Sequence, residues 1–166
     1  MNNARARACG VPSGLRVHQH LPNANHADAF CIPLPARDQR ALDALIARRG
    51  TAGLERVLAA LRDLLVRPFG LKPIGKPAIA PFQLLELDAQ EAVYGVDDRH
   101  CDVRLSYTKR SGPQGTELVA TTLVETHNRL GRCYLRCILP FHGLVVRRQL
   151  QRIAAGNGHG HSHDNR

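Results

Sequence analysis

The apolar positions in the last third of the chain follow the period of an α-helix. They recur at steps of three and four residues, and the predicted core face consists of Leu130, Cys133, Tyr134, Cys137, Ile138, Phe141, Leu144 and Val145. This spacing predicts one long amphipathic helix over residues 128–155, with Asn128 as its N-cap. Pro140 lacks a backbone N–H, so we expect a kink at that point of the helix.

The first half of the chain has a more irregular pattern. Residues 1–27 contain Gly, Pro, Asn and His without periodicity and are predicted to form a disordered leader. Residues 28–35 are predicted to form a short strand that ends at its prolines. Amphipathic helices are predicted over residues 36–48 and 51–67, and residues 67–81 are rich in Pro and Gly, which is typical of a connector.

After this connector the hydrophobic period changes to two, which indicates strands. Strands are predicted over residues 82–88, 92–96, 101–108 and 117–126, and a hairpin loop is predicted at residues 111–115. The strand at 101–108 alternates most regularly, so we expect one of its faces to be covered and the other to be wet.

The order of these elements predicts an α+β fold. In this fold an antiparallel β-sheet packs against a long C-terminal α-helix and two shorter N-terminal helices. Such an arrangement is the helix-grip plan, which often leaves a cavity between the sheet and the helix. We assign a single domain to residues 28–155, after the disordered leader at 1–27 and before a disordered, histidine-containing tail at 156–166.

The composition adds a strong positive charge to this picture. The 166 residues include 23 Lys and Arg but 14 Asp and Glu, so the formal net charge is +9. The lysines are Lys72, Lys76 and Lys109 alone, and such a preference for Arg is what a GC-rich genome produces by itself. Aromatic residues amount to 4%, with no Trp, which argues against a groove that stacks on bases. We therefore do not expect a nucleic-acid-binding protein.

Five cysteines are scattered along the chain without CxxC spacing. Cys133 and Cys137 are four residues apart on one helical face, which is farther than a disulfide allows, so we expect them in the core of a protein from a reducing compartment. The N-terminus lacks the apolar run of a secretory signal. The sequence also contains no stretch of about 18 apolar residues, the length that is needed to span a membrane. These features predict a cytoplasmic protein.

Three segments of the chain resemble a known bacterial family. They read FGLKP (69–73), DDRHCDVR (97–104) and GTELVATTLVETHNRLGRCYLRCILPFHGLVVRRQL (115–150). They are similar to the domain of unknown function 2867 (DUF2867) family, whose typical segments read VLGLDDRHLDFR and THNRLGRxYL followed by PFHRLIVR. The resemblance covers about residues 28–153. The chain departs from the family pattern at Cys101, where Leu is expected, and at Gly143, where Arg is expected.

The resemblance implies a fold and the kind of domain that accompanies it in other proteins, but no established activity. Members of the family occur alone or after a short-chain-dehydrogenase-like domain, so a dehydrogenase-like protein is a candidate partner. Their element order is similar to that of START-like (SRPBCC) helix-grip domains, which bind ligands. This sequence contains no dinucleotide-binding fingerprint, so a dehydrogenase activity is not transferred and no cofactor is predicted.

Two polar clusters and one histidine are the candidate chemical groups. Residues 97–100 precede a strand, where His100 could titrate at the mouth of a cavity or the four residues could simply form a turn. Glu125 and His127 lie at a junction between strand and helix, where they could act as acid or base in an apolar cavity or could fix the junction by capping. His142 could contact a ligand or bind the carbonyl groups that the nearby proline leaves free.

Nucleophilic and metal chemistry receive less support. Cys101 is next to His100, but neighbours on a strand point to opposite faces, so a catalytic thiolate is not expected. His159, His161 and His163 alternate near the C-terminus and could bind a transition metal weakly, or could be part of a polar end. A structural zinc site needs four ligands at fixed spacing, so no metal site is predicted.

These observations lead to three hypotheses. The first is a non-enzymatic helix-grip domain that binds a small apolar or amphipathic molecule between the sheet and the long helix. Its predicted ligand-binding residues are His100, Val103, Leu105, Leu123, Glu125, His127, Tyr134, Phe141 and His142. The second is a basic surface-interaction protein for anionic lipid, nucleic acid or an acidic protein partner. The third is a cyclase- or dehydratase-like enzyme that uses Glu125 or His100 as a base.

Overall fold

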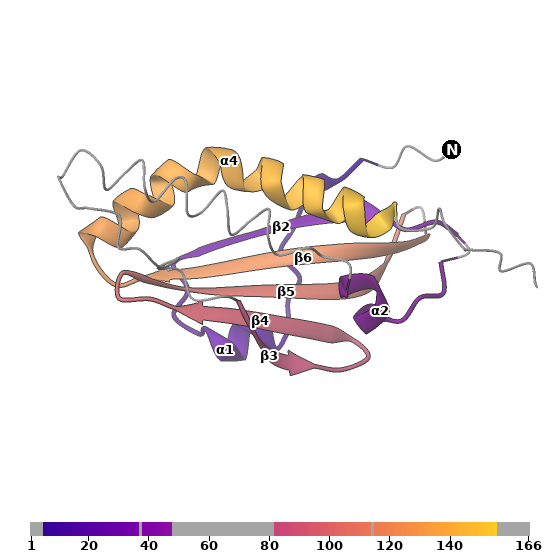
Figure 1. Ribbon diagram of the computed structural model, residues 1–166, viewed down its shortest axis with the longest axis horizontal. Helices are drawn as coiled ribbons and strands as arrows, with labels where there is room; N and C mark the ends of the chain where they lie inside the picture. Colours follow the sequence, from indigo (N-terminus) through magenta and orange to yellow (C-terminus); the bar gives the residue numbers. More distant parts are fainter. Residues whose placement is uncertain (1–4, 37, 48–81, 114, 156–166) are drawn as a thin grey trace, which may run out of the picture.

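The computed structural model describes residues 5–36, 38–47, 82–113 and 115–155. Within these ranges, strands and short helices are followed by one long helix at the C-terminal end (Figure 1). The elements are β1 (Arg7–Cys9), α1 (Val17–His20), β2 (His26–Pro33), α2 (Leu42–Ile46), β3 (Gln83–Leu87), β4 (Glu91–Asp97), β5 (Cys101–Gly112), β6 (Gly115–Thr126) and α4 (Arg129–Ala154).

The described strands form one six-stranded sheet in the order β1-β2-β6-β5-β4-β3. Every neighbouring pair is antiparallel, and one β-bulge interrupts the pairing of β3 with β4. All five strands predicted from the sequence are present as β2 to β6, because a period of two reports which residues face the core. The predicted α+β fold, with an antiparallel sheet and a long C-terminal helix, is therefore confirmed.

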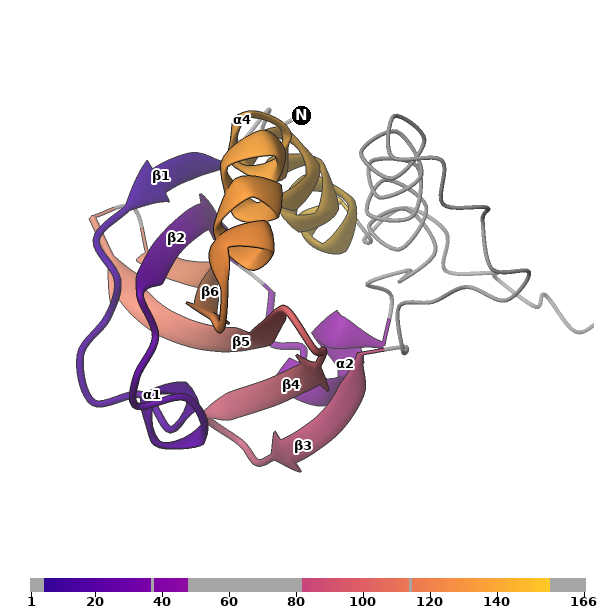
Figure 2. The same cartoon turned by 90° about the vertical axis from the view of Figure 1, so that its left-hand side faces the viewer.

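The two faces of the sheet are covered by different parts of the chain. One face carries Leu118, Ala120 and Thr122 of β6 and packs against α2 and α4, so we call it the helix face. The main core lies there and includes Phe30, Ile32, Leu105, Tyr107, Val146, Leu150 and Ile153. The opposite face carries Val119 and Leu123, and Figure 2 shows α1 on the side of the sheet away from α4.

The prediction of a disordered leader is wrong for residues 5–27. This segment contains β1, α1 and the first residues of β2. β1 extends the sheet by pairing with β2, while Val17 and Leu21 pack against Val93 and Leu123 on the opposite face. The segment has no hydrophobic period of its own because side chains from distant strands hold it in place.

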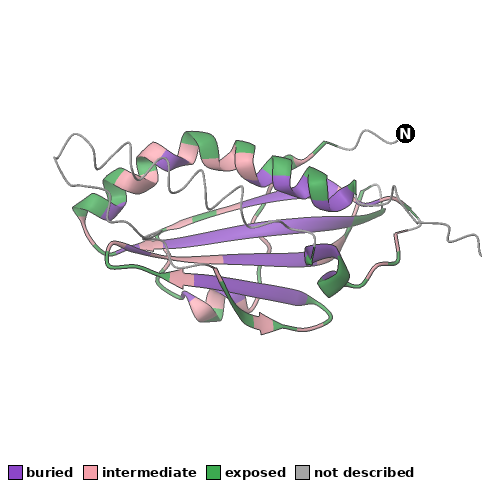
Figure 3. Cartoon of the chain, viewed as in Figure 1, coloured by how far each residue is buried: buried purple, intermediate pink, exposed green. Residues whose placement is uncertain are grey.

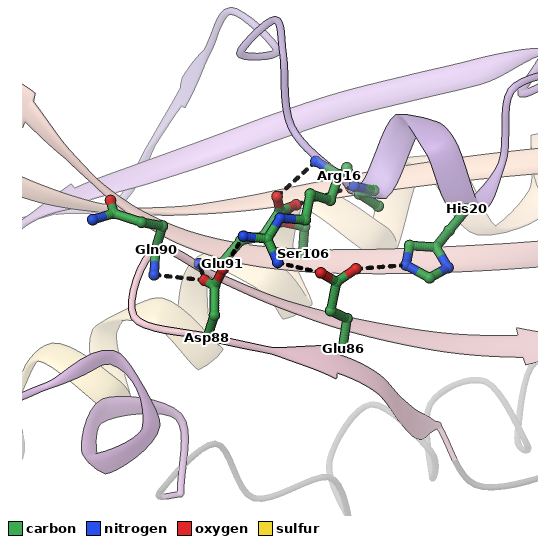
Figure 4. Close-up of polar contacts among 8 residues, drawn as sticks. Arg16, His20, Glu86, Asp88, Gln90, Glu91 and Ser106 are labelled. Carbon is green, nitrogen blue, oxygen red and sulfur yellow. Dashed lines mark hydrogen bonds and ion pairs between the residues drawn. The ribbon is translucent and has the colours of Figure 1, made fainter.

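One of the side chains that hold the N-terminal segment in place is Glu91 on β4, whose carboxylate is buried (Figure 4). It accepts hydrogen bonds from the backbone N–H groups of Arg16 (2.7 Å) and Val17 (3.2 Å) and from the Ser106 hydroxyl (2.6 Å). The Arg16 side chain also forms ion pairs with Glu86 and Asp88. The start of α1 is thereby fixed to β3, β4 and β5.

A second buried carboxylate, that of Glu117, holds β1 at the other end of the segment. Glu117 is 1% exposed and accepts hydrogen bonds from Arg7 (2.6 Å) and Arg110 (3.2 Å). Burial raises the pKa of the Glu117 carboxyl, but the hydrogen bonds and charges of these two guanidinium groups outweigh it, so the pKa lies below its ordinary value. Glu117 is therefore a stably ionised anchor.

The N-terminal helices agree with the prediction only in part. α2 falls within the predicted helix at 36–48, but it is short, and its Leu42, Leu45 and Ile46 side chains are buried. The predicted helix at 51–67, the connector at 67–81 and the tail at 156–166 lie outside the described residues.

The long helix α4 begins and ends where the sequence predicts. Asn128 is its N-cap, because its side-chain oxygen accepts a hydrogen bond from the backbone N–H of Gly131 (2.9 Å). Pro140 lies inside the helix, and α4 arches along the sheet in Figure 1.

The predicted core face of α4 is wrong. Of the residues assigned to it, Ile138 is buried, whereas Leu130, Cys133, Phe141 and Leu144 are exposed and the remaining three are partly buried. The side that packs on the sheet instead carries Gly131, Ile138, Val146, Gln149, Leu150 and Ile153. Figure 3 shows exposed residues along the outer side of the helix. The pattern misled because α4 has two apolar stripes, and both repeat with the helical period.

Candidate functional site

A polar group interrupts the apolar contact between α4 and the sheet. Asp28 on β2, Thr122 on β6, Leu105 on β5 and Tyr94 on β4 are register partners, so they form one row across the helix face. The row is polar on the two strands beneath α4 and apolar on the two strands beyond it. This is an amphipathic surface formed by four strands.

His142 of α4 lies over the polar end of this row. Its Nε2 atom is 3.2 Å from the Thr122 hydroxyl and 3.2 Å from Oδ1 of Asp28. His26, at the start of β2, contacts the other oxygen of Asp28 at 3.5 Å. Two imidazoles therefore approach one carboxylate, and each of the three side chains is partly buried. We call His26, Asp28, Thr122 and His142 the polar seam cluster.

The electrostatics of the polar seam cluster favour an ionised Asp28. Burial raises the pKa of its carboxyl, but the hydrogen bond and charge of His142, and then those of His26, outweigh this effect. The pKa of Asp28 therefore lies below its ordinary value. A negative charge is held between the sheet and the helix, where it would otherwise be costly.

Burial along the helix face decreases toward one end. The row of Phe30, Ala120, Tyr107 and Ala92 is fully buried. The row of the polar seam cluster is partly exposed at Asp28, and the next row is partly exposed at His26, Val103 and Val96. The polar seam cluster thus lies where the closed core gives way to residues that solvent reaches.

Phe30 positions the turn of α4 that carries His142. The two rings pack edge to face with centroids 6.3 Å apart, and the Arg147 guanidinium lies 5.2 Å above the Phe30 ring. A Cβ atom at Gly143 would lie 3.0 Å from Cζ of Phe30. The departure from the family pattern at Gly143 therefore leaves room for the Phe30 ring beside the helix.

A second cluster joins the two motifs DDRHCD and THNRLG. The His127 N–H donates to the His100 carbonyl (3.0 Å), and the Asn128 amide contacts Nδ1 of His100 (3.1 Å). A Cβ atom at Gly131 would lie 2.1 Å from the same carbonyl oxygen, so only glycine allows this approach. His127 also pairs with Asp102 at 3.2 Å. These contacts support the capping interpretation of the junction.

The structure brings only some of the predicted ligand-binding residues together. Val103 and Leu105 lie on the helix face of the sheet, the face that His142 of α4 also contacts through Thr122. Leu123 and Glu125 lie on the opposite face of the sheet, so they cannot line the space between the sheet and α4.

The other predicted residues lie at the junction or on α4. His100 and His127 belong to the junction cluster, and His127 is exposed. Tyr134 is partly buried, and Phe141 is 52% exposed on the outer side of the helix. The hydrophobic period predicts that Leu123 and Phe141 face the ligand space, because it shows that a face is apolar but not whether that face lies between the sheet and α4.

Three residues of the polar seam cluster were missed by the sequence analysis. His26 lies in the segment predicted to be a leader, Asp28 is the first residue of a predicted strand, and Thr122 belongs to a predicted strand with polar residues on both faces. A signal for Asp28 was present in the sequence. The residues two and four positions after it, Phe30 and Ile32, are apolar and face the core, so a charged residue on the same face of the strand is unusual.

The cysteines do not offer a reactive thiolate at this site. Burial, followed by the charges of Asp98 and Asp102, raises the pKa of Cys101 to about 11. The pKa of the buried Cys31 is also raised to about 11, chiefly by burial and by its contact with Cys9. The prediction that Cys133 and Cys137 are core residues is wrong, because Cys133 is exposed and Cys137 is partly exposed.

Neither a metal-binding cluster nor a membrane-spanning helix occurs in the described ranges. These residues contain no group of three or more His, Cys, Asp and Glu side chains arranged to hold a metal ion. None of the helices in the described ranges is long and apolar enough to cross a bilayer.

The chain belongs to the family described as Protein of unknown function (DUF2867), whose model matches residues 20–149. No curated protein matches the sequence at a significant level. A solved structure, CalU16 from Micromonospora echinospora, is 13% identical and covers 92% of this chain and 90% of its own, with a TM-score of 0.26. At that TM-score the similarity supports no conclusion about fold or function.

Proposed function

We propose that the domain binds a small amphipathic molecule between the sheet and the N-terminal half of α4. The observation that carries the proposal is the polar seam cluster, which places an ionised carboxylate, a hydroxyl and two imidazoles beside apolar side chains at the partly exposed end of the core. Binding sites for small molecules commonly combine apolar walls with a few convergent polar groups.

The arrangement indicates which part of the molecule goes where. Leu105 and Tyr94 continue the row beyond Thr122, and Val103 and Val96 form the next row toward the exposed end. An apolar chain would lie along these residues, while its polar group would reach Asp28, Thr122 and His142. Burying such a chain contributes about 0.8 kcal/mol per methylene group.

The charge of Asp28 selects the chemistry of the polar group. Its lowered pKa keeps the carboxylate ionised at neutral pH, so it accepts hydrogen bonds and attracts positive charge. A hydroxyl or amino group fits this site, whereas the carboxylate of a fatty acid would be repelled. We therefore expect a neutral or cationic amphiphile.

Three ten-carbon amphiphiles test this proposal: decanol, decylamine and decanoate. Isothermal titration of the purified chain, below the aggregation concentration of each probe, should show binding of the alcohol and the amine and at least about tenfold weaker binding of decanoate. The variant Asp28→Asn removes the charge and should abolish this discrimination.

A steric variant and its control locate the site. Val103→Trp should block binding because residue 103 lies on the helix face, whereas Leu85→Trp adds the same ring at an exposed position of β3 beside Gly95 and Arg104, on the opposite face, and should leave binding unchanged. Circular dichroism would verify that both variants are folded. Absence of binding by all three probes, or equal binding to the Val103→Trp variant, would contradict the proposal.

A further inference from the structure

The outer side of α4 carries an apolar stripe that the sheet does not cover. Of the described residues, the large apolar side chains that are exposed fall into two groups, one on β3 and one on α4. On α4 these are Leu130 (56% exposed), Phe141 (52%) and Leu144 (50%). Cys133 and Cys137 continue the stripe between them, since the five positions follow at steps of three and four.

Positive charge surrounds this stripe. Every charged residue of α4 is an exposed arginine, namely Arg129, Arg132, Arg136, Arg147, Arg148 and Arg152. No Asp or Glu occurs between residues 129 and 154. The exposed leucines of β3 are different, because Glu86 lies among them. Apolar exposure and concentrated positive charge therefore coincide on α4 in a way that β3 does not repeat.

We propose that this outer stripe of α4 docks on the surface of a lipid bilayer that contains anionic lipids. A helix that lies in the membrane interface inserts its apolar side chains among the headgroups and places arginines against the lipid phosphates. At about 1.5 Å per residue, α4 provides an axis of roughly 40 Å, with its outer side directed away from the sheet (Figure 1). Docking would remove Leu130, Phe141 and Leu144 from water.

The arginines of α4 argue against two other partners for this surface, a second copy of the chain and a nucleic acid. In a symmetric dimer through this stripe, arginines of one copy would face arginines of the other, because α4 offers no acidic residue to pair with them. A nucleic acid would use the arginines but would leave the aliphatic side chains at the centre of the surface without a partner. An anionic bilayer satisfies both groups.

This surface is separate from the proposed ligand site, so the two proposals can fail independently. His142 contacts Asp28 and Thr122 on the sheet side of α4, whereas Leu144 is exposed. A variant at Leu144 should therefore leave the polar seam cluster intact.

The absence of tryptophan from the sequence makes a direct test possible. Leu144→Trp introduces the only tryptophan of the chain into the stripe, and Leu84→Trp introduces it at a matched exposed position on β3. With vesicles of equal phosphatidylcholine and phosphatidylglycerol, the emission of the first variant should shift to shorter wavelength and that of the second should not. Vesicles of phosphatidylcholine alone should produce a much smaller shift.

The contribution of charge is tested with Arg132, Arg136 and Arg148 changed together to Gln. Arg147 is left in place because it packs over Phe30. Each arginine near an anionic surface contributes about fivefold to binding, so sedimentation with the mixed vesicles should weaken on the order of 100-fold. Phe141→Ser together with Leu144→Ser should weaken binding to the same vesicles without changing the thermal melting of the free protein.

Three results with vesicles or with the free protein would overturn the proposal. They are equal spectral shifts for the Leu144→Trp and Leu84→Trp variants, unchanged vesicle binding after removal of the apolar side chains, and concentration-dependent dimerisation that the Phe141→Ser and Leu144→Ser pair abolishes. Tight binding to duplex DNA that depends on the arginines but not on Phe141 and Leu144 would assign the surface to nucleic acid instead.

Discussion

Asp28 shows how a single residue can combine a structural role with a chemical one. Its carboxylate lies beneath a helix, in a strand whose following positions Phe30 and Ile32 enter the core. It is tolerated there because the imidazoles of His142 and His26 lie within hydrogen-bond distance of its two oxygens. An apolar residue at position 28 would extend the apolar core toward this end of the sheet, whereas the acid keeps a charged, partly exposed group there.

The lowered pKa of Asp28 predicts a specific pH dependence of stability. A carboxyl whose folded pKa lies below its unfolded value, about 3.9, stabilises the fold above that value, and this contribution is lost as the pH falls through the folded pKa. Asp28→Asn should therefore cost about 1 to 3 kcal/mol at pH 7 and distinctly less below pH 3.

Urea unfolding at both pH values measures this difference. Thr122→Val serves as the control, because it removes a contact of His142 without removing a titrating group. Its destabilisation should be similar at the two pH values. Equal costs of Asp28→Asn at pH 7 and at low pH would show that the Asp28 charge does not stabilise the fold.

At the scale of elements, the junction between β6 and α4 depends on close contact with the turn before β5. Gly131 lies in the first turn of α4 against the backbone carbonyl of His100, which belongs to the DDRH segment. Asn128 caps the helix and contacts the same turn. The two family motifs thus form one structural unit.

Two glycines of α4 provide a matched pair for testing this contact. Ala is the better helix former by about 1 kcal/mol, so Gly→Ala should stabilise α4 where space allows. Gly131→Ala should instead destabilise the protein by about 1 to 3 kcal/mol, because its Cβ would meet a backbone oxygen. At Gly143 the added Cβ would meet only the Phe30 side chain, which can move, so Gly143→Ala should cost less stability than Gly131→Ala.

Chemical denaturation of the two variants gives the comparison. A Gly131→Ala variant as stable as the parent would show that the turn at His100 can move away from α4. A Gly143→Ala variant with the greater loss would show that the Phe30 contact is the more rigid of the two.

The sequence predicted the elements better than it predicted their orientation. The strands β2 to β6 and the bounds of α4 follow from hydrophobic period and from capping by Asn128, which are local signals. The covered side of α4 did not follow, because Leu130, Phe141 and Leu144 repeat with the same period as the buried Ile138, Val146 and Leu150. Which of the two stripes faces the sheet depends on the chain packed beneath the helix.

The same limit explains how much of the candidate site was found. His142, Val103 and Leu105 were identified by type and by element, but Asp28 and His26 come from a strand that precedes them by more than 70 residues. Their proximity to His142 is a property of strand order, since β2 pairs with β6 beneath α4. No local pattern contains that information.

At the scale of the whole molecule, the sheet is the middle layer between α4 with α2 on one face and residues 11–24 of the N-terminal segment, which include α1, on the other (Figure 2). The N-terminal segment is held on its face of the sheet by a different kind of contact from the apolar packing of α4 and α2. It is short, and buried polar contacts of Glu91 and Glu117 supplement its small apolar cluster.

This difference predicts that the N-terminal segment can be released by one substitution. Glu91→Ala leaves the N–H groups of Arg16 and Val17 without their acceptor, and each lost buried hydrogen bond costs about 1 to 3 kcal/mol. Trypsin under native conditions should then cleave after Arg16 much faster, and mass spectrometry would detect the fragment that begins at Val17.

Gln90→Ala is the control for this experiment. Gln90 is exposed, and its contact with Asp88 uses the backbone N–H, which the substitution retains. Its cleavage rate should match that of the parent. Equal cleavage rates for Glu91→Ala and the parent would show that the apolar contacts of Val17 and Leu21 suffice to hold the segment.

The anchoring of the N-terminal segment by distant strands also determines when it can fold. Arg16 finds its acceptor 75 residues later, and Arg7 finds Glu117 after an interval of 110 residues. During synthesis, the segment therefore leaves the ribosome long before the strands that fix it exist. The part of the described chain that is made first is among the last to reach its place, and contacts of such long range are typical of slow folding.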